Sequence, residues 1–376
     1  MITTRLHGAI DYTVAALLGS LATSRGLPPA VRATLGATSL FHTGYAVLTD
    51  YEAGLSPRLT MRQHLALDAA GGAALCGAGL LMRRQPVGAR ALLIALGLSE
   101  LAVVALSGTK PTSGPGGDTD LVGRMLGDAV ASPTELGYPP LDTPKPVAEG
   151  VFVVDSTLSG LMGRILPARM TVIRLPDGGL LLHSPTQFSL GLKDELEKLG
   201  PIQHLVAPNV AHWTFLQPWQ RACPDATTWA APGLRERSQV QKSGVRLDYD
   251  LSDVPPAEWG DAIELATVPG GFGFHEVALF HRSTRTLVLT DLVLNLEAPK
   301  VPAALRFLAR LFGITAPDGM PPPYLRAVIK LRRQEAAHGA SRLLDLQPER
   351  VIFAHGRWFE RDGTAALRRS LRWLLD

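Results

Sequence analysis

The uneven distribution of charge along the chain most constrains its fold. The first 110 residues contain nine Lys or Arg and five Asp or Glu, whereas the other 266 contain 28 and 29. Four apolar stretches fill the first part, at residues 6–23, 31–49, 64–82 and 91–108. Each approaches the ~20 residues that cross ~30 Å of hydrocarbon as a helix. We therefore predict an all-α, four-helix transmembrane bundle over residues 1–110, with the lipid bilayer as its partner.

An Ala- and Gly-rich soluble bundle is the alternative for this region. Small residues dominate the third stretch, and small residues at four-residue spacing allow helices to pack closely in lipid. The two faces of a four-span bundle would carry four and five basic residues, so positive-inside counting leaves the membrane orientation open.

Ionisable residues interrupt the apolar stretches at regular positions. The pairs His7/Asp11 and His64/Asp68 share a four-residue spacing, which places both members on one helix face. Asp50 and Glu52 end the second stretch, so these six residues are expected to gather at one membrane face. Two further ionisable residues lie deeper in the spans, His42 and Glu100.

Two interpretations apply to this polar cluster, because ionisable groups within spans usually face the bundle interior. The group at the membrane face is expected to fix the helix register through His–Asp hydrogen bonds. A metal, haem or proton site is the functional alternative. For His42 and Glu100 neither interpretation is favoured.

The rest of the chain divides into a linker and a soluble domain. Residues 111–144 are rich in Pro and Gly, which is typical of an exposed connection. Residues 145–376 carry ordinary charge and form the predicted soluble domain. Two cysteines in the whole chain argue against a disulfide scaffold. The net charge is only +3, and basic and acidic residues are nearly equal in number, so there is no reason to expect nucleic-acid binding.

Short β runs alternate with helical stretches in the soluble part, which predicts an α/β domain. The predicted strands are 151–155, 170–175, 179–183, 204–207, 263–267, 276–281, 286–290 and 351–354. The predicted helices are 190–199, 213–223, 302–312, 324–344 and 364–375. Polar residues follow or precede several strands, where α/β folds place their sites. His204 and His281, within strands, are expected at the surface.

Four segments carry a family resemblance: Leu182-His-Ser-Pro-Thr, Val206-Ala-Pro-Asn-Val-Ala-His, the run from Glu276 to Leu292, and Phe353-Ala-His-Gly. In their order and spacing, residues 145–376 resemble the metallo-β-lactamase fold, and more closely its bacterial DUF4336 branch. The resemblance implies an αββα sandwich and a site for one or two zinc or iron ions. It also implies a bacterial protein. Together with the four apolar stretches of residues 1–110, this predicts an integral, multi-pass protein of the bacterial inner membrane.

The resemblance carries over to single residues. His212 matches the last His of the family's H-x-H-x-D-H motif, Asp291 its bridging Asp, and His355 its final His. Asn209 stands where the motif has its second His, while Ala207 and Ala211 replace two further ligands. His275 is a weak match to the middle His, because it falls several residues late. The resemblance therefore implies one divalent metal, zinc or iron, in place of two.

Three functions follow as hypotheses. The first is a membrane-anchored hydrolase of an ester, lactone, thioester or phosphodiester, with Asp291 and Asn209 as catalytic residues and His183 and Glu276 supporting the ligands. The second is a metal-free fold that binds a ligand or protein beside the membrane. The third is a haem- or redox-linked membrane protein that uses histidines of the bundle.

Overall fold

The structure is a computed structural model of the 376-residue chain. It describes residues 2, 4–24, 26–51, 54, 58–107, 137–159, 165–301, 306 and 309–376. The predicted linker falls largely outside the described residues, as do Glu52 and most of the predicted helix at 302–312. The chain divides into two compact units, Met1–Met125 and Leu126–Asp376, which are treated separately below.

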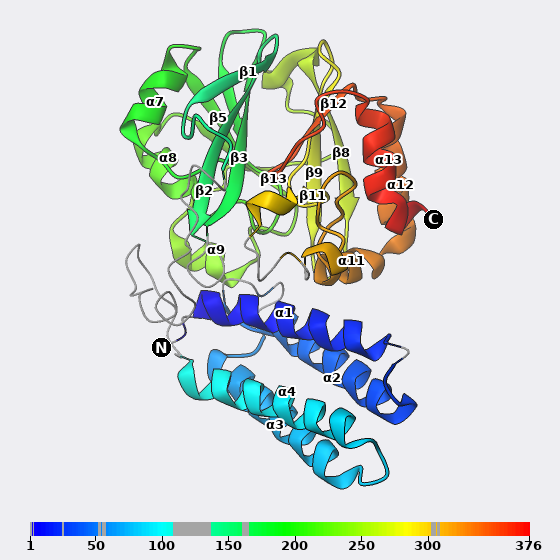
Figure 1. Cartoon of the computed structure of the whole chain (residues 1–376). Helices are drawn as coiled ribbons and strands as arrows, with labels where there is room; N and C mark the ends of the chain where they lie inside the picture. Colours follow the sequence, from blue (N-terminus) through cyan, green and yellow to red (C-terminus); the bar gives the residue numbers. More distant parts are fainter. Residues whose placement is uncertain are drawn as a thin grey trace. The chain divides into compact units, whose positions relative to one another are not determined.

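In its described residues, the first unit consists of four long helices (Figure 1). They are α1 (Thr4–Ala22), α2 (Pro29–Leu48), α3 (Met61–Leu81) and α4 (Val87–Leu106). Thr60 and Gln63 form a capping box that begins α3. Among the described residues, α3 and α4 are long and apolar enough to cross a membrane. The helical character of this region is thus confirmed, whereas four membrane spans stay a prediction.

Glycine lets α3 and α4 approach closely. A Cβ at Gly97 would overlap the carbonyl oxygen of Gly72, and a Cβ at Gly79 would lie 2.8 Å from the carbonyl oxygen of Arg90. Small residues at such positions bring two helix backbones into contact. The close packing that the third apolar stretch predicts is therefore present between α3 and α4.

The second unit is built on two main sheets and a short two-stranded pair. The first sheet runs, in spatial order, β1 (Pro144–Ala148), β2 (Val151–Ser159), β3 (Ile165–Arg174), β4 (Leu180–His183), β5 (Ile202–Ala207), β6 (Thr227–Ala230) and β7 (Tyr249–Asp250). The second runs β12 (Arg350–Ile352), β10 (Thr286–Val288), β9 (His275–His281) and β8 (Ile263–Pro269). The parallel pair is β11 (Leu294–Asn295) and β13 (His355–Gly356).

Helices cover the outer faces of the two main sheets, as Figure 1 shows. Beside the first sheet lie α7 (Leu190–Glu197) and α8 (Leu216–Ala222). Beside the second lie α12 (Arg333–Asp345) and α13 (Gly363–Leu375). The other elements in the described residues are α9 (Ser238–Ser243), α11 (Pro323–Lys330) and the 3-10 helices η2 (Ala257–Ala262) and η3 (Ala298–Lys300). The unit is therefore an αββα sandwich.

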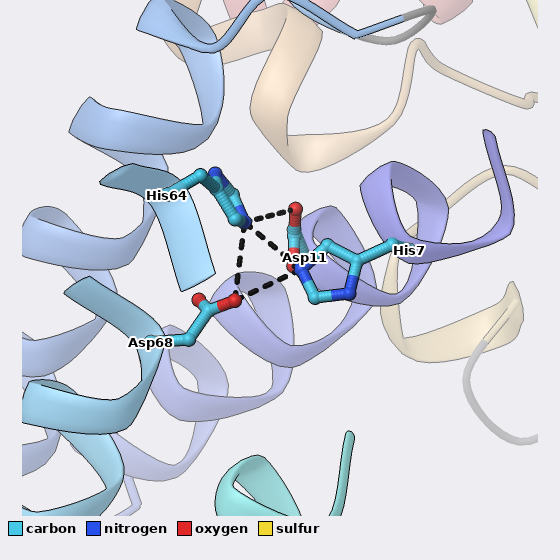
Figure 2. A group of neighbouring side chains, drawn as sticks. All are labelled: His7, Asp11, His64 and Asp68. Atoms are coloured by element: carbon cyan, nitrogen blue, oxygen red, sulfur yellow. Dashed lines mark hydrogen bonds and ion pairs between the residues drawn. The ribbon is translucent and has the colours of Figure 1, made fainter. Parts of the chain in front are cut away.

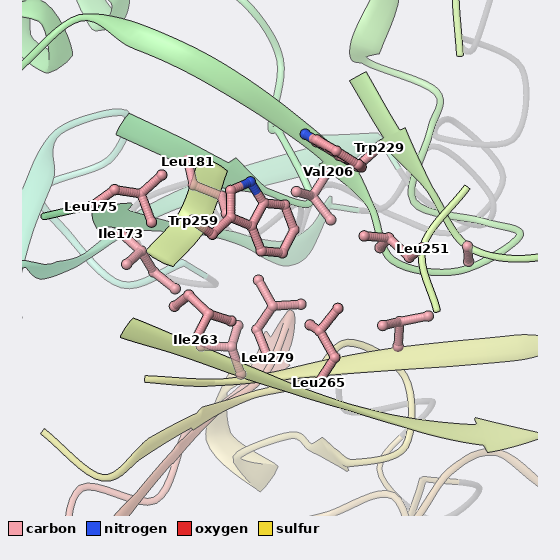
Figure 3. Packing of buried hydrophobic residues seen from close by; sticks show 13 residues of the cluster. Ile173, Leu175, Leu181, Val206, Trp229, Leu251, Trp259, Ile263, Leu265 and Leu279 are labelled. Carbon is pink, nitrogen blue, oxygen red and sulfur yellow. The ribbon is translucent and has the colours of Figure 1, made fainter. Parts of the chain in front are cut away.

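The apolar core lies between the two sheets (Figure 3). Alternation along β8 explains it, because Ile263 and Leu265 are buried while Glu264 between them is partly exposed. From the first sheet, Leu181 and Val206 pack against the same cluster. Complete burial of each such side chain stabilises the fold by roughly 1.5–3 kcal/mol.

Two sequence predictions need correction here. The single helix expected at 324–344 is two helices, because Arg332 leaves helical geometry at φ −123° and ψ 45°. His204 and His281 are buried in their strands, each 5% exposed, although a surface position was expected. His204 packs edge-on against Trp259, which explains why a polar residue is accommodated in this part of the core.

Candidate metal site

Three predicted ligands from separate parts of the chain converge in the second unit. His212 lies in the loop after β5, Asp291 follows β10, and His355 begins β13. The Nε2 atom of His212 is 3.2 Å from Asp291 Oδ2, and the Nε2 atom of His355 is 3.5 Å from Asp291 Oδ1. Their ligand atoms all lie within 4.8 Å of one another. The structure thus brings together the residues that the family resemblance singled out.

Hydrogen bonds at the other ring nitrogens orient both imidazoles. His355 Nδ1 lies 2.9 Å from the carbonyl oxygen of Pro167. A carbonyl only accepts, so Nδ1 carries the proton and Nε2 of the neutral ring has a free lone pair. His212 Nδ1 lies 2.6 Å from Ser184 Oγ. Ligating histidines usually have such partners, which fix the ring and its tautomer.

Ser184 is a residue that pattern reading missed. It follows β4 directly and has φ +56°, a left-handed backbone conformation that residues other than glycine rarely adopt. Strained backbone of this kind is concentrated at functional sites. Here it accompanies the placement of the Ser184 hydroxyl beside His212.

The charges of the group favour an ionised carboxylate. Burial alone would raise the pKa of Asp291, but the charge and hydrogen bond of His212 hold it well below its ordinary value. Burial alone would lower the pKa of His212, but the charge of Asp291 raises it. Burial and then the charge of Asp291 raise the pKa of Tyr324, so this phenol stays protonated near the site. Tyr324, at the start of α11, carries no motif that would have marked it.

Asn209 is a positioning residue and not a ligand. Its Nδ2 donates to Asp291 Oδ2 at 2.8 Å and to Thr290 Oγ1 at 2.9 Å. Its Oδ1 accepts from the backbone N–H groups of Ala211 and His212. Asn209, which is expected as a catalytic residue at the position of a motif histidine, therefore uses its oxygen for the backbone and its amide for Asp291.

Glu276 holds the loop that carries Asp291. It is fully buried, and its two oxygens accept from the backbone N–H groups of Thr290, Asp291 and Leu292 at 2.8–3.2 Å. Burial, followed by the charge of Asp291, raises the pKa of Glu276 in spite of these hydrogen bonds. Its role is therefore to fix the backbone of Thr290–Leu292.

The other two histidines that were expected at the site lie outside the group of three. His275 Nδ1 lies 3.1 Å from the carbonyl oxygen of Pro232 and 3.3 Å from that of Gly273, so the geometry does not support it as a fourth ligand. His183 is buried at the end of β4, and burial lowers its pKa to about 3. It is therefore neutral. Its Nε2 has no partner among the described residues.

A buried ion pair anchors the segment that carries His355. Arg169 pairs with Asp155 at 2.6 Å and donates to the carbonyl oxygens of Phe353 and Gly356. Gly356 has φ +94°, and a Cβ there would overlap the carbonyl oxygen of Asn295 on β11. Only glycine permits this close approach of β13 to β11, which places His355.

The donor set fits a single divalent metal. Two imidazole nitrogens and one carboxylate leave room for water in a fourth position, as in catalytic zinc sites, and the same set suits non-haem iron. Ala207 and Ala211 supply no donor for a second ion. One zinc or iron ion, held by His212, Asp291 and His355, is compatible with the residues present.

The polar residues of the helical unit also gather, at a separate place. His7, Asp11, His64 and Asp68 point toward one another (Figure 2). His42 Nδ1 lies 3.6 Å from Glu100 Oε1, and a cavity of about 30 Å³ adjoins them. Asp50 lies outside the group of four. That cavity has about the volume of one water molecule.

Comparisons with known proteins concern the second unit. Solved structures similar to it include a metallo-β-lactamase from Pontibacter korlensis, with 15% identity, a TM-score of 0.43, and coverage of 62% of this chain and 98% of that one. Another is a metallo-β-lactamase from Hirschia baltica, with 12% identity, a TM-score of 0.43, and coverage of 61% and 96%. A third is the metallo-β-lactamase FIM-1 from Pseudomonas aeruginosa in a mono-zinc form, with 14% identity, a TM-score of 0.40, and coverage of 61% and 96%.

The search of curated proteins found no match. A family model does match, and its match ends before His355 and leaves the helical unit uncovered. The predicted family resemblance is confirmed: residues 149–315 match DUF4336, a domain of unknown function.

Proposed function

We propose that the chain is a membrane-anchored, mononuclear metal-dependent hydrolase. The observation that carries the proposal is the convergence of His212, Asp291 and His355 within 4.8 Å, with both histidine Nε2 atoms directed at the carboxylate. Their side chains are 12–17% exposed, so water and a small substrate can reach them. Buried structural metal sites, by contrast, are closed.

The residues around the site divide the work. His212, Asp291 and His355 hold the ion, which when bound polarises a carbonyl or phosphoryl oxygen and acidifies water. Asn209 keeps Asp291 in position, and Ser184 and the Pro167 carbonyl keep the imidazoles in theirs. Esters, lactones, thioesters and phosphodiesters are the substrate classes that such chemistry serves.

The helical unit supplies the membrane anchor. Besides the length and apolarity of α3 and α4, large apolar side chains face outward on its surface. Leu81 is 79% exposed, Val87 76% and Leu40 76%. Exposed apolar surface of this kind is typical of contact with lipid. We infer a multi-pass protein of the bacterial inner membrane.

Metal content and hydrolysis by the purified full chain test the catalytic proposal. The wild type should bind one more equivalent of zinc or iron than the His212→Ala/His355→Ala variant. It should also hydrolyse at least one ester, lactone, thioester or phosphodiester that the double variant does not hydrolyse. His338→Ala, which removes an exposed histidine of α12, is the matched control and should change neither property. Equal metal content in wild type and double variant would contradict the site assignment.

A metal-free binding module is the second candidate. It is favoured by the ability of His212 and His355 to pair directly with Asp291, and by the loss of ligands at Ala207, Ala211 and Asn209. Under this function, the two variants and the wild type would all contain no metal attributable to the second unit, even after loading.

A further inference from the structure

The four side chains gathered in the helical unit share one focus (Figure 2). His7 Nε2 lies 2.9 Å from Asp68 Oδ2, and His64 Nε2 lies 3.0 Å from Asp11 Oδ2. The two Nε2 atoms are 3.0 Å apart. A tetrahedral shell with bonds of ~2.0–2.1 Å to nitrogen places ligand atoms about 3.3 Å from one another. The four donors are therefore spaced as ligands of one ion.

The hydroxyl beside His7 decides which of its ring nitrogens carries a proton. Ser107 Oγ donates its only proton to the carbonyl oxygen of Val103 at 2.6 Å. It must therefore accept from His7 Nδ1, which lies 2.7 Å away. In the neutral ring, Nε2 is then the unprotonated nitrogen, with its lone pair directed into the group.

The same arrangement recurs at His64. Thr49 Oγ1 donates to the carbonyl oxygen of Tyr45 at 2.7 Å, so it accepts from His64 Nδ1, also at 2.7 Å. His64 Nε2 thus faces His7 Nε2 without a proton between two neutral rings. Two lone pairs at 3.0 Å repel each other unless a cation lies between them.

The two carboxylates are also held from behind. Tyr45 donates to Asp68 Oδ1 at 2.5 Å, and Tyr51 donates to Asp11 Oδ2 at 2.8 Å. All four side chains therefore have a hydrogen-bond partner outside the group. Outer partners of this kind orient metal ligands and contribute to affinity.

The charge of the group favours a cation in the same place. The four side chains are 0–2% exposed, and no Lys or Arg among the described residues pairs with Asp11 or Asp68. Two uncompensated carboxylates are very costly in such surroundings. One divalent ion neutralises them. Protonation of both imidazoles is the competing solution, and the experiment below separates the two.

A small cavity adjoins this group. Its volume is about 30 Å³, enough for one water molecule, and Asp11, His42, Asp68 and Glu100 line it. His42 is 3% exposed, and its Nε2 has no hydrogen-bond partner in the described part of the chain and lies 3.5 Å from Asp11 Oδ1. His42 Nε2, or a water in the cavity, is therefore available as an additional donor.

The geometry points to a divalent metal site within the helical unit, formed by His7, Asp11, His64 and Asp68. Two imidazoles with two carboxylates favour first-row transition metals such as zinc, iron or manganese over calcium and magnesium, which prefer oxygen ligands alone. This site is separate from the one formed by His212, Asp291 and His355, and it does not depend on the proposed hydrolase activity.

The test uses the full chain carrying His212→Ala/His355→Ala, so that metal in the second unit is removed. After chelation, the protein is loaded with cobalt(II). We expect one equivalent of bound cobalt, with visible ligand-field absorption that zinc abolishes by displacement. Addition of His64→Ala should reduce bound cobalt to less than a tenth of an equivalent. Absence of cobalt from the parent variant, or an unchanged content after His64→Ala, overturns the proposal.

Tyr51→Phe guards against a simple folding failure. It removes one hydrogen bond to Asp11 and no ligand, so helicity should persist while cobalt affinity falls 10–100-fold. His338→Ala should leave the affinity unchanged. Nitrogen chemical shifts of the histidines distinguish the competing solution: two protonated imidazoles that do not respond to added cobalt or zinc also overturn the proposal.

Discussion

The two groups of His and Asp in this chain use the same residue types but are built in different ways. In the helical unit, His7/Asp11 and His64/Asp68 lie one turn apart on two helices and are almost completely buried. In the second unit, His212 and Asp291 lie in loops, His355 begins β13, and the three side chains are 12–17% exposed. Helix geometry aligns each pair of the first group, whereas every member of the second group is placed by a different part of the chain.

This difference separates two uses of similar donors. A buried group with room for one water can hold an ion firmly but admits no substrate. A partly exposed group next to loops can admit one, since loops on a rigid scaffold are where substrates reach functional residues. Variants that disturb the support of one group, with the other unit as the reference, test this comparison.

Loss of Arg169 should have the largest effect. Arg169→Ala leaves buried Asp155 with Lys145 as its remaining partner and frees the Phe353–Gly356 segment, so the second unit should lose about 3 kcal/mol of unfolding free energy. Tryptophan fluorescence measures this unit alone, because all six tryptophans lie between residues 213 and 373. Arg369→Ala, at an exposed ion pair with Asp318, should change little. If Arg169→Ala unfolds at the same denaturant concentration as the wild type, the anchoring role is contradicted.

Removal of Asn209 should affect metal binding more than folding. Asn209→Ala deletes the amide that holds Asp291, so zinc affinity of the second unit should fall 10–100-fold. Titration in a His7→Ala/His64→Ala background isolates this site. Gln239→Ala on α9 is the control. Asn295 is not suitable, because it supports β13. Undiminished affinity in Asn209→Ala would show that Asp291 needs no such support.

Closer packing between α3 and α4 should disturb the helical unit. The added methyl of Gly97→Ala meets the Gly72 carbonyl and Cys76, so overpacking should cost roughly 1–3 kcal/mol. Far-UV circular dichroism of the full chain in detergent reports the loss, while tryptophan fluorescence should stay constant. Gly77→Ala on α3, where nothing lies within 4 Å, should be neutral or stabilising. Equal effects of the two variants would remove the packing argument.

A smaller effect should appear in the pH dependence of the second unit. Burial lowers the pKa of His204 below 6.5, and Trp229 Nε1 donates to its Nδ1. Below pH 6.5 the unfolded chain binds a proton that the folded chain resists, so stability falls as pH decreases, by at most about 1.4 kcal/mol per pH unit. His204→Gln should flatten this slope in fluorescence-monitored unfolding between pH 7 and 5. An unchanged slope would assign the dependence to other groups.

Much of the fold can be predicted from the periodicity of apolar residues and from the Gly and Pro residues that end helices and strands. The predicted strands at 151–155, 263–267 and 276–281 correspond to β2, β8 and β9, because alternating apolar residues need a buried sheet face. The expected helix at 324–344 was wrong in being continuous, since the Arg332 break carries no Gly or Pro signal. The surface position expected for His204 was wrong because burial depends on what packs against the strand.

The candidate sites divide in the same way. The sequence alone determined the i,i+4 pairs of the helical unit, since 3.6 residues per turn puts them on one face, and the family motif pointed to His212, Asp291 and His355. Only the tertiary structure decided that α1 and α3 bring their pairs to one focus, that Asn209 positions and does not ligate, and that Ser184, Arg169 and Tyr324 surround the second group. The physical reason is range. Helical and strand periodicity act over a few residues, whereas these contacts join residues up to 187 positions apart and exist only when the whole core has packed.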